Sequence, residues 1–168
     1  MMDSTLNIQN LVIEKIEDPL TIIHVLHAAY KRYEFEPIPS SALFETEQTI
    51  LENLQRGITI FSARVAGEVV GIVKYEVTNE GAYFSRLAVL PSFQGLGIAS
   101  KLIHFLTKYA YTENQQSIYC KARKSEPDNI RLYKKLGFII TKEEYTKNPN
   151  GVSMGVYTMH KTITPAQT

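Results

Sequence analysis

Two glycines, Gly95 and Gly97, stand between an apolar run that ends at Pro91 and an amphipathic stretch that begins near Leu96. Glycine lets a backbone approach a ligand closely, because it has no Cβ atom and adopts conformations that other residues avoid. The first N–H groups of a helix have no partner within the helix and lie at the positive end of its dipole. A strand that passes through glycines into a helix therefore predicts a phosphate-binding turn.

The composition is that of a globular protein. The chain has 168 residues, of which 44% are hydrophobic and 21% charged, and its formal net charge is +1. A chain of this length buries a core without help from metals or disulfides, so one domain over residues 1–168 is expected, with residues 163–168 as a frayed tail. The balanced charge argues against a nucleic-acid surface, and the apolar runs are too short to span a bilayer.

Cysteine and histidine usage favours a cytoplasmic protein without a metal. The single cysteine, Cys120, cannot form an internal disulfide, which fits a reducing compartment, and we expect it in the core. Asp3 and Asn7 interrupt the beginning of the chain, where a secretory leader would be apolar. His24 and His27 lie three apart on an expected helix without a third ligand, so no metal site is predicted.

Hydrophobic periodicity predicts the elements that position these residues. Expected strands are 6–16, 58–65, 69–77, 82–90, 117–122, 138–144 and 152–163, and expected helices are 18–33, 46–56, 96–111 and 126–137. The second helix should bury Ile50, Leu51 and Leu54. Short turns join the strands between 58 and 90 into an antiparallel meander, whereas a helix separates 82–90 from 117–122, as in a parallel crossover. The sheet should therefore be mixed, with helices on both faces.

Three short motifs follow one another in the second half of the chain. They are Leu87-Ala88-Val89-Leu90-Pro91, Gln94-Gly95-Leu96-Gly97-Ile98-Ala99, and Asn129 followed by Leu132-Tyr133-Lys134-Lys135-Leu136-Gly137-Phe138. The glycine motif alone is weak, because short glycine patterns arise by chance. In this order the three motifs resemble the GNAT superfamily of acetyl-CoA-dependent N-acetyltransferases. The resemblance implies an α/β (α+β) single-domain fold with a mixed, mostly antiparallel seven-stranded sheet and about four helices on both faces.

The resemblance also implies a site for acetyl-CoA as acyl donor. In this family the glycine turn binds the pyrophosphate, and the preceding strand offers main-chain groups to the pantetheine and to the thioester carbonyl, the latter as an oxyanion hole. The residues so implied are Leu87, Ala88, Val89, Gln94, Gly95, Leu96, Gly97, Ile98, Ala99, Ser100, Asn129 and Tyr133. Asn129 matches the asparagine that binds the cofactor arm, and Tyr133 matches the tyrosine near the sulfur. As alternatives, Asn129 is only a helix cap, or both a cap and a cofactor ligand, and Tyr133 is only a core aromatic residue.

The chemistry implied is direct attack of a primary amine on the thioester. Deprotonating an amine with a pKa of about 10.4 at pH 7 costs about 4.6 kcal/mol, and only the neutral amine attacks the thioester. A base in the site is therefore useful. Tyr133 is expected to donate a hydrogen bond to the leaving thiolate. The candidate base is Glu76 or Glu34, with a water held by Tyr83 or Ser85 as the alternative. Many family members place a glutamate where residues 83–89 lie here, but this chain has none there.

The sequence leaves the identity of the acceptor amine open. Glu34, Glu36, Glu45 and Glu47 form either a solvated edge or the mouth of an acceptor site that favours a cationic amine. We expect a small amine, and a protein N-terminus is a further candidate. A sensor that binds acyl-CoA without transferring the acetyl group is the alternative function, because fold alone does not determine activity. A homodimer is common in such families and is also left open.

Overall fold

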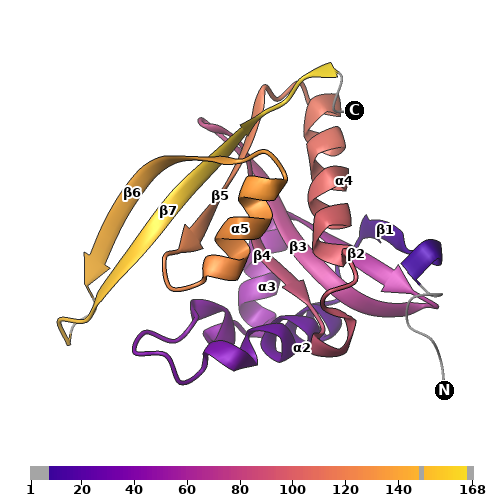
Figure 1. The fold of residues 1–168 in the computed structure, drawn as a ribbon. Coiled ribbons are helices and arrows are strands. Elements are labelled where there is room, and N and C mark those ends of the chain that lie inside the picture. Colours follow the sequence, from indigo (N-terminus) through magenta and orange to yellow (C-terminus); the bar gives the residue numbers. More distant parts are fainter. Residues whose placement is uncertain (1–7, 148–149, 166–168) are drawn as a thin grey trace. The chain divides into compact units, whose positions relative to one another are not determined.

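The computed structural model describes residues 8–147 and 150–165 (Figure 1). Its helices are α2 (Pro19–Tyr30), α3 (Glu47–Gln55), α4 (Ile98–Thr112) and α5 (Pro127–Lys135), with short 3-10 helices η1 (Ile8–Asn10), η2 (Lys31–Tyr33), η3 (Ser41–Phe44) and η4 (Pro91–Phe93). Its strands are β1 (Val12–Lys15), β2 (Thr59–Val65), β3 (Glu68–Thr78), β4 (Gly81–Val89), β5 (Ser117–Arg123), β6 (Ile139–Lys147) and β7 (Ser153–Thr162).

The strands form one sheet in the order β1-β2-β3-β4-β5-β7-β6. Strands β4 and β5 pair in parallel, whereas β1–β2, β2–β3, β5–β7 and β6–β7 pair in antiparallel fashion. The predicted seven-stranded, mixed and mostly antiparallel sheet with four helices is thus confirmed. No helix within the described ranges is long and apolar enough to cross a membrane.

The chain divides into two compact units. Among the described residues, the first consists of residues 8–76 and Arg86–Phe105, and the second of Val77–Ser85, 106–147 and 150–165. Strands β3 and β4 and helix α4 each contribute residues to both units. The end of the predicted tail, 166–168, lies outside the described residues.

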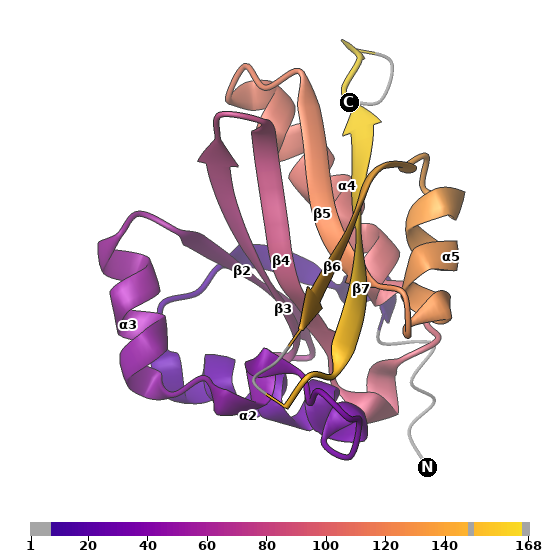
Figure 2. The ribbon, with the colours of Figure 1, turned by 90° about the vertical axis from the view of Figure 1, so that its left-hand side faces the viewer.

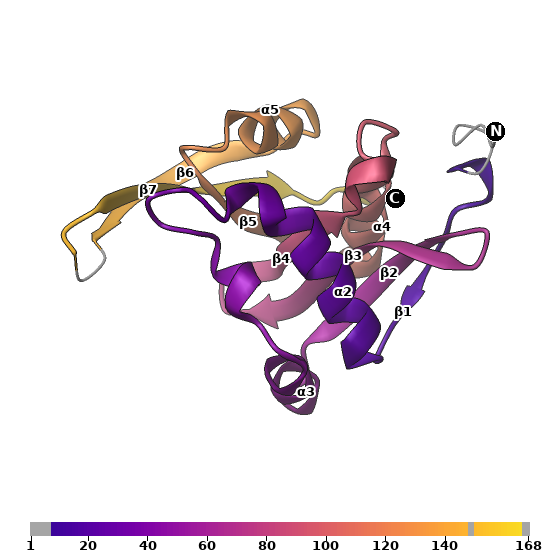
Figure 3. The ribbon, with the colours of Figure 1, turned by 90° about the horizontal axis from the view of Figure 1, so that it is seen from below.

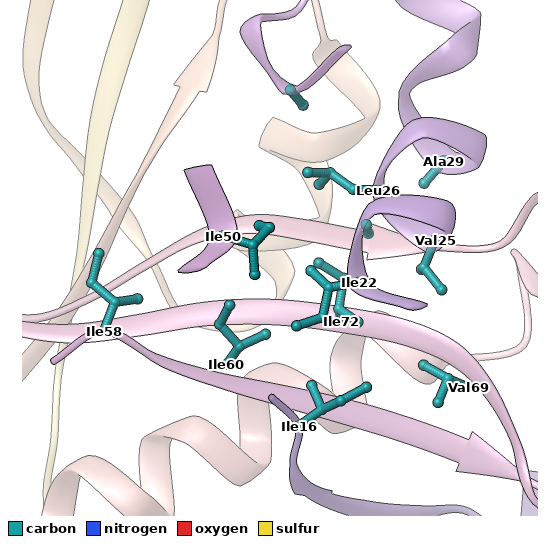
Figure 4. Packing of buried hydrophobic residues seen from close by; sticks show 12 residues of the cluster. Ile16, Ile22, Val25, Leu26, Ala29, Ile50, Ile58, Ile60, Val69 and Ile72 are labelled. Carbon is teal, nitrogen blue, oxygen red and sulfur yellow. The ribbon is translucent and has the colours of Figure 1, made fainter. Parts of the chain in front are cut away.

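In the first unit, helices cover both faces of β2 and β3. Alternate strand residues point to opposite faces. Ile60 and Ile72 pack with Ile22 of α2 in a buried apolar cluster (Figure 4), and α2 lies across β2 and β3 (Figure 3). Phe61 points the other way, because its ring lies 5.0 Å from that of Phe105 on α4. Helix α3 lies beside α2 (Figure 2).

Local signals explain where α2 and α3 begin. The Asp18 carboxylate caps α2 by accepting the Leu20 N–H at 3.3 Å, with proline at the first helical position. Thr46 and Thr49 form a reciprocal capping box at the start of α3. The expectation for the buried face of α3 was wrong at Leu51, which is 41% exposed.

In the second unit, α5 packs its apolar side on an aromatic cluster. Phe84 of β4 lies edge-on to Phe138, with ring centroids 5.9 Å apart, and 5.8 Å from the ring of Tyr133. Strands β6 and β7 form a long hairpin (Figure 1) whose β6 strand is largely exposed. Ile163, where the predicted tail begins, is buried, and its N–H donates to the Gln116 carbonyl at 2.9 Å.

Candidate active site

The turn from β4 into α4, residues 90–97, has the backbone that its glycines predict. Gly95 has φ of 78° and Gly97 has φ of 85°, the left-handed region that favours glycine. The Lys101 N–H donates to the Gly97 carbonyl at 3.0 Å, so the first bond of α4 closes on Gly97. The N–H groups of residues 98–100 therefore have no acceptor within the helix. A Cβ atom at either glycine would meet nothing within 4 Å. This turn offers donors and room for an anion.

The main chain of β4 before this turn has one edge on β3 and one edge away from it. The Leu90 N–H donates to the Val70 carbonyl of β3 at 2.8 Å. Because main-chain polar groups alternate between the two edges of a strand, Leu87 and Val89 direct theirs away from β3. On that edge the Leu87 carbonyl accepts the Tyr30 hydroxyl at 3.0 Å.

Gln94 ties the turn back to the strand. Its Nε2 donates to the Val89 carbonyl at 3.0 Å. The carbonyls of Leu87 and Val89 thus each have a side-chain donor, one from α2 and one from the β4–α4 turn. The structure brings Leu87, Val89 and Gln94 together, and it adds Tyr30, whose role no motif in the sequence indicates.

A buried ion cluster stands beside the same stretch of β4. We call Ser41, Glu45, Asn53, Lys74 and Arg86 the Glu45 cluster. The Glu45 carboxylate is buried; one oxygen pairs with Lys74 Nζ, and the other accepts Arg86 Nε at 2.6 Å. Lys74 Nζ also donates to Asn53 Oδ1 at 2.6 Å, and Arg86 Nη2 donates to Ser41 Oγ at 2.9 Å. Burial lowers the pKa of Lys74, and the hydrogen bond to Glu45 opposes that shift.

This cluster corrects both expectations for Glu45. The sequence placed it with Glu34, Glu36 and Glu47, on a solvated edge or at an acceptor mouth. Instead, Glu45 is buried and neutralised by two cations. Of the other acids, Glu34 and Glu47 are exposed and Glu36 is half-buried. A charged residue in the middle of an apolar strand, such as Lys74, is the sequence signal for such a cluster, because lysine is almost never fully buried without a partner.

In the second unit, Asn129 and Tyr133 lie one helical turn apart on α5 and so on one side of it. The Tyr133 ring is buried, 5.8 Å from Phe84 and 6.1 Å from Phe138. Asn129 is inside the helix, whose cap is Glu126, and Asn129 Nδ2 donates to Glu126 Oε2 at 3.0 Å. The reading of Asn129 as only a helix cap is therefore wrong.

Comparison with known proteins identifies the family. The model described as "Acetyltransferase (GNAT) family" matches residues 23–138, which include the β4–α4 turn, Asn129 and Tyr133. The chain belongs to the GNAT family of acetyltransferases. Proteins of this family use acetyl-CoA as cosubstrate.

Several solved structures have the same fold as this chain. The ribosomal-protein-S18-alanine N-acetyltransferase from Escherichia coli is 20% identical, with a TM-score of 0.74 over 92% of this chain and 94% of that one. A GNAT acetyltransferase from Streptococcus pneumoniae is 17% identical, with a TM-score of 0.72 over 91% and 99%. A spermidine N-acetyltransferase variant from Vibrio cholerae is 20% identical, with a TM-score of 0.71 over 92% and 94%. At these identities the likeness shows the GNAT fold.

The two candidate bases of this GNAT protein lie on different elements. Glu76 is half-buried near the end of β3, whereas Glu34 is exposed in the segment that follows η2. Cys120 is buried, and burial raises the pKa of its thiol, which fits the expected core role. Within residues 8–147 and 150–165, no group of three or more His, Cys, Asp or Glu side chains is placed to hold a metal ion.

Proposed function

We propose that this GNAT protein transfers the acetyl group of acetyl-CoA to a small primary amine, which attacks the thioester directly. The observation that carries the proposal is the β4–α4 turn, where glycines with positive φ precede N–H groups that have no acceptor in the helix. Such a turn suits the pyrophosphate of the cosubstrate. The predicted binding residues of the turn are Gln94, Gly95, Leu96, Gly97, Ile98, Ala99 and Ser100.

The main chain of Leu87, Ala88 and Val89 is proposed to bind the pantetheine and the thioester carbonyl. Support comes from the edge of β4 that points away from β3, because its carbonyls already have side-chain donors and its N–H groups run parallel to them. An N–H group directed at the thioester oxygen stabilises the negative charge that develops there during amine attack. Asn129 is assigned to the cofactor arm and Tyr133 to the leaving thiolate by resemblance.

The test of this function is release of free CoA thiol from acetyl-CoA in the presence of a panel of amines. The panel should include a polyamine, an amino sugar, an amino acid, an uncharged aliphatic amine and a short peptide with a free N-terminus. We expect thiol release with at least one small amine, and an acetylated product of matching mass. Thermal stabilisation by acetyl-CoA without thiol release from any amine would instead support a sensor.

The general base is proposed to be Glu76. A base must be held within hydrogen-bond reach of its proton, and a strand holds a side chain more precisely than an exposed loop does. We expect Glu76→Gln to lower kcat about 10²-fold and to remove the acidic limb of the kcat profile against pH. Glu34→Gln makes the same change at an exposed position. It should leave kcat within about twofold of the wild type and keep the acidic limb of the pH profile. If kcat fell further in Glu34→Gln than in Glu76→Gln, Glu34 would be assigned as the base instead. If kcat fell in neither variant, a water chain would be favoured.

A further inference from the structure

Arg86 has a backbone conformation that is unusual for its position. Its φ is 54°, in the left-handed region that non-glycine residues avoid. Among the residues that the structure describes, the other two non-glycine residues of this kind, Ala66 and Asn114, lie in turns between elements. Arg86 instead lies within β4, directly before Leu87. Strained backbone of this kind persists only where the surroundings hold it in place.

The Glu45 cluster supplies those surroundings. Arg86 Nε and Nη2 donate to Glu45 and Ser41, at 2.6 and 2.9 Å, so two points hold the guanidinium. Glu45 in turn is held by Lys74 from β3, and its main-chain carbonyl accepts the Nε2–H of His27 from α2 at 2.9 Å. Hydrogen bonds between ionised groups are the strongest that a protein side chain makes, and more so where water is excluded. The carboxylate is therefore a fixed anchor for Arg86.

The strain lies immediately before the main chain that carries the proposed chemistry. A positive φ at Arg86 sets the direction of the strand that follows, and Leu87 and Val89 are then held through their carbonyls by Tyr30 and Gln94. The segment 86–89 is thus fixed from η3, α2 and the β4–α4 turn. A main-chain donor is useful in catalysis only if its direction is fixed before the reaction, and a displacement of about 1 Å costs about 10²-fold in rate.

We propose that Glu45 and Arg86 are positioning residues, which together hold β4 in the conformation that aims the N–H groups of Leu87 and Val89 at the thioester. This inference rests on the proposed function, in which those groups bind the thioester. It assigns no direct contact with substrate to the guanidinium. What matters at position 86 is therefore the backbone conformation, and the charge matters only because it maintains that conformation.

Substitution of Arg86 by glycine or by alanine distinguishes the effect of the backbone conformation from the effect of the charge. Both remove the guanidinium and leave the buried pair of Glu45 and Lys74 intact. Glycine adopts a positive φ without strain and so does not need the contact with Glu45. Alanine is strained at a positive φ and no longer has that contact to hold it there. We expect Arg86→Ala to lower kcat about 10²-fold and to raise KM for acetyl-CoA by a smaller factor, because the same segment is proposed to bind the pantetheine. Arg86→Gly should keep kcat within about threefold of the wild type. Equal losses in the two variants, or no loss in either, would overturn the proposal.

A matched control is Lys121, an exposed cation within β5 that the site does not use. At an ordinary strand position glycine is less stable than alanine, because it loses more freedom on folding. At position 121 the alanine variant should therefore have a higher Tm than the glycine variant. At position 86 the glycine variant should have the higher Tm. The same order at both positions would contradict the role of φ at Arg86.

Hydrogen exchange provides a readout that does not depend on acetyl transfer. The Leu90 N–H, which donates to Val70, reports whether β4 keeps its alignment on β3. We expect the peptide containing residues 87–90 to exchange faster in Arg86→Ala than in the wild type, and to exchange at the wild-type rate in Arg86→Gly. If the wild type released no thiol from any amine, the proposed function would fail, whereas equal exchange in the two variants would refute the positioning role.

Discussion

Replacing Tyr133 by phenylalanine is expected to lower turnover about 10²-fold while leaving the Kd for acetyl-CoA within about twofold of the wild type. The reason is the leaving group. A thiolate forms as the thioester breaks, and the Tyr133 hydroxyl is proposed to donate a hydrogen bond to it. A phenol has a pKa near 10 and a thiol a pKa near 8.5, so moving a proton from the phenol to the thiolate is unfavourable by about 2 kcal/mol. The expected role of Tyr133 is therefore to donate a hydrogen bond without transferring the proton.

The substitution of Tyr133 by phenylalanine should leave the packing around the ring unchanged. The ring is 7% exposed and lies against Phe84 and Phe138, and phenylalanine keeps every carbon of it. We therefore expect the free energy of unfolding to change by no more than about 1.5 kcal/mol, the net contribution of one hydrogen bond. Turnover is measured as thiol release at saturating acetyl-CoA, and affinity by calorimetry.

Tyr119→Phe is the matched control for Tyr133→Phe. Tyr119 is also buried in the second unit, and its hydroxyl makes a hydrogen bond of 2.7 Å with Thr78 Oγ1. Removing the Tyr119 hydroxyl costs this hydrogen bond without touching a proposed catalytic group. An equal fall in turnover in both variants would point to general loosening of the unit. Unchanged turnover in Tyr133→Phe would remove Tyr133 from the mechanism and restore its reading as a core aromatic residue.

Features determined by neighbours in sequence were predictable. The alternation of apolar residues predicted β2, β3 and β4 within one residue at each end, because period and turn signals are local. Asp18-Pro19 predicted the start of α2, and the glycines at 95 and 97 predicted the left-handed turn, since only glycine adopts such φ values without strain. The family resemblance rested on the same local motifs, which is why it could be stated from sequence.

Lys74 signals that a buried cluster exists, but its partners in the Glu45 cluster were not predictable, because they are far apart in the chain. Glu45 is 29 residues from Lys74 and 41 residues from Arg86. Its neighbours in sequence are Phe44, Thr46 and Glu47, and nothing in that run marks Glu45 as a buried residue. Whether such a carboxylate is buried depends on which cations the sheet brings to it, and this is decided by tertiary packing.

The same limit explains the error at Leu51 of α3 and the absence of Tyr30 from the predicted site. Leu51 and Ile50 are adjacent and equally apolar, and only the direction in which the helix meets α2 selects Ile50 as the buried one. The Tyr30 hydroxyl reaches a carbonyl 57 residues away, a contact that no spacing in the sequence announces. Local patterns therefore determine the elements and the cofactor turn, whereas the groups that hold β4 in place follow from the packing of the elements.

The cofactor turn is tested by Gly97→Ala, which is expected to raise the Kd for acetyl-CoA at least about tenfold, equivalent to about 1.4 kcal/mol. Gly97 has φ of 85°, where a Cβ atom costs roughly 1 to 2 kcal/mol. Apart from the chain neighbours of Gly97, no atom lies within 4 Å of the place where that Cβ would stand, so the strain comes from the backbone conformation and not from a clash. The backbone should therefore relax, and the N–H groups of residues 98–100 would move away from the pyrophosphate. Once acetyl-CoA saturates the enzyme, turnover should be nearly unchanged.

Gly57→Ala supplies the control, because it imposes the same strain elsewhere. Gly57 follows α3, has φ of 89° and also has nothing within 4 Å of an added Cβ. Both variants should lose similar stability, but only Gly97→Ala should lose affinity. Acetyl-pantetheine, which carries the thioester without the pyrophosphate, distinguishes the cause further, because its KM should be the same in Gly97→Ala and the wild type. Equal losses of affinity for both donors would mean that the turn acts on the thioester end, and the assignment of the pyrophosphate to the first turn of α4 would then be wrong.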